Sequence, residues 1–148
     1  MKKIIFLLSL IFILCACSSD SDFEPQTAAD ITTYLSENNL QAKKTNNGLY
    51  YIIEQEGSGK RPTSNSTVTV AYKGYLLDGT VFDESSASGV TFPLNAVIPG
   101  WTLGIPLFKE GGFGTLIIPS NLGYGNNGTR GIPGGAVLVF EVKLLKVN

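Results

Sequence analysis

The residues best suited to form a binding pocket gather around the only tryptophan of the chain, in the stretch Asn95–Trp101. Pro99 favours a helix start here, because its fixed φ suits the first helical turn and its missing N–H costs nothing there. Trp101 then lies on that first turn and points back over Val97 and Ile98. An apolar indole beside free backbone N–H groups is how a pocket for a small molecule or a peptide is built. The alternative is that Trp101 is simply the largest core residue.

The elements that must position this stretch are mostly strands. Runs of β-branched and aromatic residues, separated by Gly, Pro, Asn and Asp, predict them. The expected ranges are Leu49–Gln55, Thr67–Leu77, Val81–Asp83, Thr91–Leu94, Gly111–Ile118 and Ala136–Val147. The Asp78-Gly79 pair between the second and third of these is a hairpin turn signal.

Alternation within the longest strands predicts which face of the sheet is buried. Val68, Val70 and Tyr72 fall on one face. The matching inward positions of the last strand are Leu138, Phe140, Val142 and Leu144. Pro106 ends the central helix near Ile105, because proline inside a helix clashes with the preceding turn. We therefore expect an α+β domain in which an antiparallel sheet of about five strands wraps around one short helix.

The N-terminus has the features of a secretion signal. Lys2 and Lys3 precede an apolar run, Ile4–Leu14, which is too short to span a bilayer as a stable helix. The residues Leu14-Cys15-Ala16-Cys17 resemble a bacterial lipoprotein box. This resemblance implies a signal peptide over residues 1–16 and a lipid on Cys17. Its acyl chains would hold the protein on a membrane of the cell envelope, on the periplasmic or the surface face of the outer membrane. The alternative is an ordinary signal peptide with incidental cysteines.

Three segments follow the predicted cleavage site. Residues 17–27 form a polar tether, and residues 28–47 hold a short helix, Ala28–Leu40, followed by a turn. Thr27 or Asp30 is the expected helix cap. This helix docks either on the sheet or on a partner chain, but it is too short for the long-helix dimers of some extracytoplasmic proteins, so we expect a monomer. Residues 48–148 form the main domain.

Composition excludes several classes of chemistry. The chain has no histidine, which excludes histidine triads and the usual zinc sites, and we expect neither a metal nor a cofactor. Of the 11 basic residues Lys2 and Lys3 are lost on cleavage, whereas all 12 acidic residues follow Cys17, which leaves a net charge of −3 and argues against nucleic acid as a partner. Gly123–Gly128 matches the dinucleotide fingerprint, but no helix pattern follows it.

Several blocks of the sequence together resemble one enzyme family. They are Val70–Gly74, Asp78-Gly79, Phe82-Asp83, Val97–Trp101, Ile118-Pro119, Tyr124-Gly125, Ile132-Pro133 and Leu138–Val142. Their order and spacing from Gly48 to Asn148 are similar to those of the FKBP-type peptidyl-prolyl cis-trans isomerases. The resemblance implies a half-wrapped, five-stranded antiparallel sheet around one short helix.

The resemblance also implies a set of site residues. The residues in catalytic positions are Tyr72, Asp83, Ile98, Trp101 and Tyr124. Those lining the substrate-binding walls are Phe82, Phe92, Val97, Ile132 and Phe140. In this arrangement Trp101 lies under the prolyl ring, the Ile98 N–H and the Tyr124 hydroxyl bond substrate carbonyls, and Asp83 orders Tyr72.

The function implied is isomerisation of Xaa-Pro bonds in peptides and in unfolded exported proteins, by desolvating and twisting the amide. Val90 departs from the aromatic residue that many members carry, which leaves binding of tacrolimus-like macrolides open. One alternative is a non-catalytic chaperone or adaptor of the same fold that holds proline-containing segments. Another is a purely structural lipoprotein.

Overall fold

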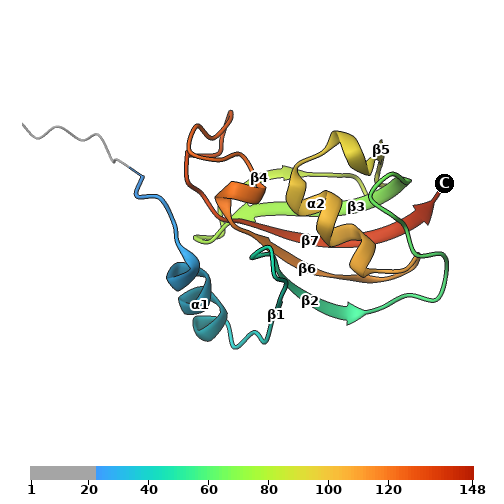
Figure 1. Ribbon diagram of the computed structural model, residues 1–148, viewed down its shortest axis with the longest axis horizontal. Coiled ribbons are helices and arrows are strands. Elements are labelled where there is room, and N and C mark those ends of the chain that lie inside the picture. The colour runs from blue at the N-terminus through green and yellow to red at the C-terminus, as the bar shows by residue number, and fades with distance from the viewer. Residues whose placement is uncertain (1–22) are drawn as a thin grey trace, which may run out of the picture.

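The structure is a computed structural model that describes residues 23–148. The predicted signal peptide, Cys17 and the first part of the tether lie outside this range. The helices are α1 (Ala28–Glu37) and α2 (Pro99–Gly104), and the short 3-10 turns are η1 (Leu94–Ala96), η2 (Ile105–Leu107) and η3 (Ser120–Leu122). The strands are β1 (Lys43–Lys44), β2 (Tyr50–Gln55), β3 (Thr67–Leu76), β4 (Val81–Glu84), β5 (Val90–Pro93), β6 (Phe113–Ile118) and β7 (Leu138–Val147) (Figure 1). Within residues 23–148, neither helix has the length and apolar character needed to cross a membrane.

All strand pairs of the sheet are antiparallel, in the order β1-β2-β6-β7-β3-β4. β4 and β5 share the outer edge of β3, because β4 pairs with Lys73–Tyr75 and β5 with Thr67–Val70. β1 adds only a two-residue ladder at the other edge. The α+β class and the antiparallel sheet predicted from the sequence are therefore confirmed. The third and fourth predicted strands, β4 and β5, pair with different parts of the same edge of β3 and so occupy one position in the sheet.

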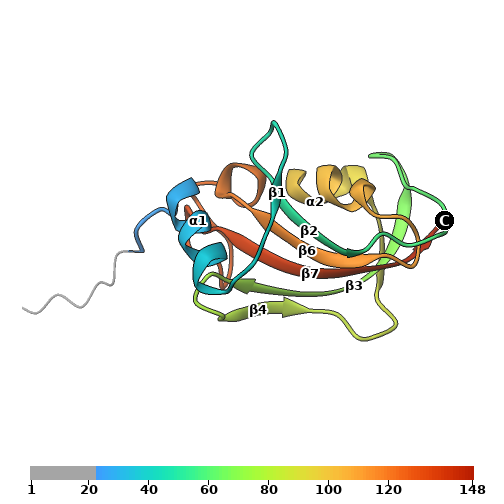
Figure 2. The same cartoon turned by 90° about the horizontal axis from the view of Figure 1, so that it is seen from below.

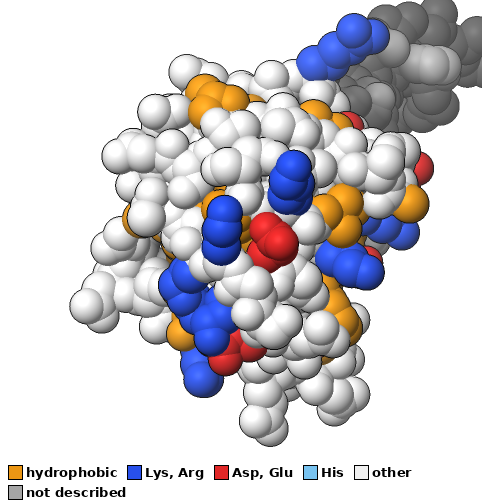
Figure 3. Space-filling model, turned by 90° about the vertical axis from the view of Figure 1, so that its right-hand side faces the viewer, with side chains coloured by type: hydrophobic (Ala, Val, Ile, Leu, Met, Phe, Trp, Pro, Cys, Tyr) orange, Lys and Arg blue, Asp and Glu red, His pale blue; other side chains and the backbone are white. Residues whose placement is uncertain are grey.

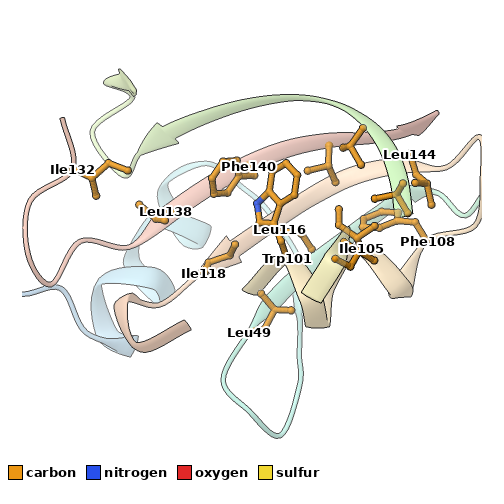
Figure 4. Close-up of a cluster of buried hydrophobic side chains, with 14 of the residues drawn as sticks. Leu49, Trp101, Ile105, Phe108, Leu116, Ile118, Ile132, Leu138, Phe140 and Leu144 are labelled. Atoms are coloured by element: carbon orange, nitrogen blue, oxygen red, sulfur yellow. The ribbon is translucent and has the colours of Figure 1, made fainter. Parts of the chain in front are cut away.

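The main core lies between the concave face of the sheet and α2 (Figures 2 and 4). Of the predicted inward residues of β3 and β7, Val68, Val70 and Leu144 are among those buried here, whereas Tyr72 is half-buried. Glycine lets α2 approach the sheet closely, because a Cβ on Gly100 would lie 2.5 Å from the Ile118 side chain. The helix that carries Trp101 is thereby fixed against β6.

α2 begins and ends close to the predicted residues. Pro99 is in the first turn, and Ile98 with ψ 147° stands outside as the N-cap residue. The helix ends at Gly104 and the chain continues as the 3-10 turn η2 through Pro106. A tighter turn suits this place because proline lacks the N–H that a further α-helical hydrogen bond needs.

α1 packs on the opposite, convex face of the sheet. Ile31 is 1% exposed and forms a second core with Ile117, Val137 and Val139. Thr27 and Asp30 both take part in capping, since the Thr27 side chain accepts from Ala29 N–H and the Asp30 carboxylate accepts from Thr27 N–H at 2.6 Å. Of the two docking places considered for this helix, the structure places it on the sheet.

α1 is shorter than the predicted range Ala28–Leu40, because it ends at Glu37. The next residue, Asn38, is the C-cap, and its side-chain amide donates to the Tyr34 carbonyl at 2.8 Å. Asn39 has φ 53°, in the left-handed region where asparagine is tolerated and a helix cannot continue.

The end of the molecule opposite α1 carries mixed charges. Figure 3 shows Lys and Arg side chains beside acidic ones on this side. Glu56, which follows β2, pairs with Arg61 at 2.7 Å and with Lys109 at 3.0 Å. Arg61 also donates to the carbonyl oxygens of Pro106 and Leu107, at 2.9 and 2.8 Å, and so fixes the C-terminal end of η2.

Candidate functional site

A cavity of about 500 Å³ opens between β3, β5, the segment around Ile98, and the loop after η3. Its lining is mostly aromatic and aliphatic, with one carboxylate and two phenol groups. The lining residues are Tyr72, Asp83, Val90, Phe92, Ala96, Val97, Ile98, Trp101, Tyr124 and Phe140. An apolar hollow with a few polar groups is the usual form of a ligand site.

The floor of the cavity is the Trp101 indole, which is 5% exposed. Three aromatic rings hold it: Tyr72 and Phe140 stand nearly perpendicular, at centroid distances of 5.0 and 5.1 Å, and Phe92 is tilted at 5.2 Å. Edge-to-face contacts of this kind fix a ring orientation beyond what burial alone does. The floor is therefore a rigid apolar surface.

The indole N–H of Trp101 is buried and has no oxygen or nitrogen acceptor among residues 23–148. Figure 4 shows the indole nitrogen on the side of the ring that faces Phe140, whose plane lies 85° from that of the indole. The indole N–H of Trp101 is therefore a buried donor without a partner in the described part of the chain, and leaving such a donor unpaired costs free energy.

The backbone of Ile98 presents a free donor at the cavity wall. Ile98 precedes the first helical turn, and within the described part of the chain no group accepts a hydrogen bond from its N–H. Thr102 fixes the preceding turn, because its hydroxyl donates to the Leu94 carbonyl at 2.6 Å. Buried backbone N–H groups are normally paired, so a half-buried unpaired one beside a cavity is a candidate for a ligand's carbonyl.

Asp83 and Tyr72 form the polar edge of the cavity. The Tyr72 hydroxyl donates to Asp83 Oδ2 at 2.7 Å. Burial, followed by this hydrogen bond to a carboxylate, raises the pKa of Tyr72 to about 12. The Tyr72 N–H also donates to the Ser85 hydroxyl at 2.9 Å, which holds β4 beside β3. The phenol therefore stays protonated and oriented at neutral pH.

Tyr124 stands at the cavity mouth on the long loop between β6 and β7. Its side chain is 40% exposed, and its hydroxyl has no hydrogen-bond partner in the portion of the chain that is described. Gly125 fixes the loop beside it: the Gly125 N–H donates to the Ser120 carbonyl and the Gly125 carbonyl accepts from the Gly135 N–H, both at 2.8 Å. The phenol is thus free to bond a ligand.

Eight of the ten residues that the sequence assigned to the site line this cavity, and Phe82 and Ile132 do not. Phe82 packs behind Phe140, with ring centroids 5.5 Å apart, and Ile132 is 6% exposed in the main core. Both support the wall rather than form it. Gly74 makes this packing feasible, since a Cβ there would lie 2.7 Å from each ring. Sequence reasoning did not identify Ala96, whose place in the lining follows from the η1 turn and has no motif of its own.

A larger depression, about 660 Å³, lies on the convex face of the sheet and is lined by strand residues such as Lys73, Glu141 and Lys143. These are opposed charges on neighbouring strands, since Lys73 pairs with Glu141 in the β3–β7 register. It has no buried aromatic floor comparable to Trp101. The smaller, aromatic cavity is therefore the better candidate for a ligand site.

Comparison with known proteins adds independent information. The family model described as FKBP-type peptidyl-prolyl cis-trans isomerase matches residues 58–145. A protein of Neisseria meningitidis named as a probable FKBP-type peptidyl-prolyl cis-trans isomerase FkpA is 53% identical over 120 residues, which are 78% of this chain and 44% of that protein. FkpA of Escherichia coli K12 is 46% identical over 108 residues, 72% of this chain and 40% of that protein. The chain thus spans less than half the length of these relatives.

Solved structures agree with these matches. The crystal structure of FkpA from Escherichia coli superposes with a TM-score of 0.75 at 40% identity, over 82% of this chain and 58% of that one. A peptidyl-prolyl cis-trans isomerase of Pseudomonas syringae superposes with a TM-score of 0.71 at 31% identity, over 85% of this chain and 98% of that one. The similarity therefore extends from sequence blocks to the whole domain.

Proposed function

Because the chain belongs to the FKBP-type peptidyl-prolyl cis-trans isomerase family, we propose that it catalyses rotation about Xaa-Pro bonds in the Trp101 cavity. The substrates proposed are proline-containing segments of exported proteins during folding. Uncatalysed rotation takes tens to hundreds of seconds, which is slow enough to limit folding. The observation that carries this proposal is the Ile98 N–H, which has no acceptor among residues 23–148 and lies beside the buried indole floor.

The proposed mechanism needs no nucleophile and no metal. Amide resonance sets the rotation barrier, about 18–20 kcal/mol for a peptide bond. Resonance and its charge separation are lost in the twisted transition state, and water stabilises the planar amide more than the twisted one. An apolar cavity removes that preference. The prolyl ring rests on Trp101, with Phe92, Val97 and Phe140 as walls.

Fixed donors then favour the twisted chain over the planar one. The Ile98 N–H bonds a substrate carbonyl, and the Tyr124 hydroxyl bonds a second. Tyr72 and Asp83 hold the rim in one arrangement, so that little reorganisation accompanies the twist. Interactions that are stronger in the transition state than in the ground state are the ones that accelerate a reaction.

The test is cis–trans exchange in an Xaa-Pro peptide, measured by NMR with the full chain in mild detergent. The variants are Asp83→Ala and Trp101→Ala, with Lys73→Ala as a control on the outward face of the same strand as Tyr72. Wild-type protein and the control should accelerate exchange equally, and each site variant should lower kcat/KM by about tenfold or more, because it removes a supporting hydrogen bond or the floor. Circular dichroism checks that every variant is folded.

The same experiment distinguishes the alternative function. Peptide shifts that report binding without acceleration of exchange would identify a proline-segment-binding chaperone or adaptor. Neither binding nor acceleration would support a structural lipoprotein.

We also propose that the protein acts as a monomer anchored in the cell envelope through a lipid on Cys17. The support is the lipoprotein box in the sequence, which lies before the described residues. Metabolic labelling with a palmitate analogue should mark the wild type and not Cys17→Ala. Light scattering that shows a stable dimer would refute the monomer.

A further inference from the structure

The segment just before α1 contacts the loop that carries Tyr124, more than a hundred residues away in the chain. Gln26 N–H donates to the Gly135 carbonyl at 3.0 Å, and the Gln26 side-chain Oε1 accepts from Val137 N–H at 2.8 Å. Figure 2 shows this segment entering α1 beside the connection between β6 and β7. Gln26 thus makes two hydrogen bonds to the backbone just before the chain enters β7, and we call this pair of bonds the clip.

The packing around this clip is close. Gly135 has φ +81°, and a Cβ on it would lie 2.7 Å from Cβ of Pro25. Val137 is completely buried, so its N–H cannot turn to water for a partner. Gln26 is half-buried, whereas Pro25 and Thr27 on either side are exposed. The amide side chain therefore points into the fold at a position where the backbone needs an acceptor.

The clip continues to the cavity mouth through the backbone. The Gly135 carbonyl bonds Gln26, and the Gly135 N–H donates to the Gly125 carbonyl at 2.8 Å. Gly125 follows Tyr124 directly, and its own N–H donates to the Ser120 carbonyl at 2.8 Å. Three successive hydrogen bonds thus connect the segment before α1 with both sides of Tyr124.

We propose that Gln26 is a positioning residue for the reaction: it clamps the Tyr124 loop so that the phenol stays over the cavity. The inference rests on the proposed function for its catalytic consequence, but the clamp itself is a property of the loop. Between η3 and β7 the loop has no helix and only the single bridge between Thr129 and Ile132, so it can take many conformations unless it is held. A mispositioned donor lowers catalysis even when the change lies far from the reacting atoms.

The experiment compares Gln26→Ala with Gln26→Glu. Alanine removes the side-chain oxygen that accepts from the Val137 N–H and keeps the main-chain bond to Gly135, whereas glutamate keeps both bonds. Thr32→Ala is the matched control, because it removes the 2.9 Å bond from the Thr32 hydroxyl to the Ala28 carbonyl within α1 and leaves the clip intact. All are full chains in mild detergent. Two readouts are taken: hydrogen exchange of the segment 123–137, and kcat and KM for Xaa-Pro exchange.

We expect faster amide exchange over residues 123–137 in Gln26→Ala, and kcat/KM lower by about three- to tenfold, as the loss of one well-placed hydrogen bond gives. Gln26→Glu should restore both, and Thr32→Ala should change neither, even where its melting temperature falls as far as that of Gln26→Ala.

Two results would overturn the proposal. One is unchanged amide exchange in Gln26→Ala. The other is faster exchange of the loop with unaltered kcat and KM. An inactive wild type refutes the proposed function instead, and the amide readout then decides by itself whether the clamp exists.

Discussion

The Tyr72 hydroxyl donates its 2.7 Å hydrogen bond to Asp83 diagonally across the β3–β4 pair, because the residue directly opposite Asp83 is Gly74. Gly74 has no side chain, and the rings of Phe82 and Phe140 fill the space beside it. One glycine therefore permits both the hydrogen bond at the rim and the aromatic wall behind it.

The first prediction concerns the titration of Tyr72. Its folded-state pKa, raised to about 12, lies above the ordinary value of 10.0, so the phenol contributes stability that is fully present below pH 10 and is lost as the pH rises towards 12. The six tyrosines can be titrated by their ultraviolet absorbance. In Tyr72→Phe the titration curve should lack one tyrosine ionisation at its high-pH end, near pH 12. Loss of a phenolate that titrates near pH 10 would contradict the assignment.

A second prediction concerns Gly74. Gly74→Ala should lower the free energy of unfolding by about 1–3 kcal/mol, because its methyl group meets two packed rings. Affinity for proline peptides should fall with it, since Phe140 lines the cavity. Lys73→Ala, at the neighbouring exposed position, is the control in urea denaturation. Equal midpoints for the two variants would show that the rings move aside freely.

A third prediction concerns Thr102, which holds the turn before Ile98. Thr102→Val keeps the shape but leaves the buried Leu94 carbonyl without its 2.6 Å hydrogen bond. We expect a loss of about 1–3 kcal/mol in stability, and a lower kcat/KM because the Ile98 N–H is less well placed. Thr102→Ser retains the hydroxyl and should recover most of both. A valine variant as stable and as active as the wild type would show that this hydrogen bond does not matter.

A fourth prediction concerns the second core. Ile31→Ala removes a side chain that is 1% exposed between α1 and the sheet, and it should cost about 2–5 kcal/mol through the cavity left behind. Ser36→Ala, on the exposed side of the same helix, should have little effect on the urea midpoint. If both variants unfold like the wild type, α1 does not pack on the sheet in solution.

Much of the fold could be predicted because burial follows a simple alternation. Val68 and Val70 lie inward as the two-residue period requires, and Pro99 begins α2 as its fixed φ favours. The docking place of α1 could not be predicted, because an apolar stripe with Ile31 at its centre fits any apolar surface. Ile117 and Val139 lie together on the convex face only once the sheet has folded.

The candidate site was predictable only where a residue type has one role. Trp101 is conspicuous as the single tryptophan, whereas Phe82 and Phe140 carry the same ring and differ only in which one faces the cavity. The clip from Gln26 to Val137 has no sequence signal, because it joins a side chain to a backbone N–H 111 residues away.

The single tryptophan also gives the protein a built-in optical reporter. All indole fluorescence of the chain comes from the floor of the cavity, where the ring is 5% exposed and surrounded by other aromatic rings. Anything that enters the cavity changes the surroundings of that one emitter, whereas events at α1 or on the convex face leave it largely unaffected. Occupancy of the cavity can therefore be titrated on the unlabelled protein, separately from any measurement of turnover.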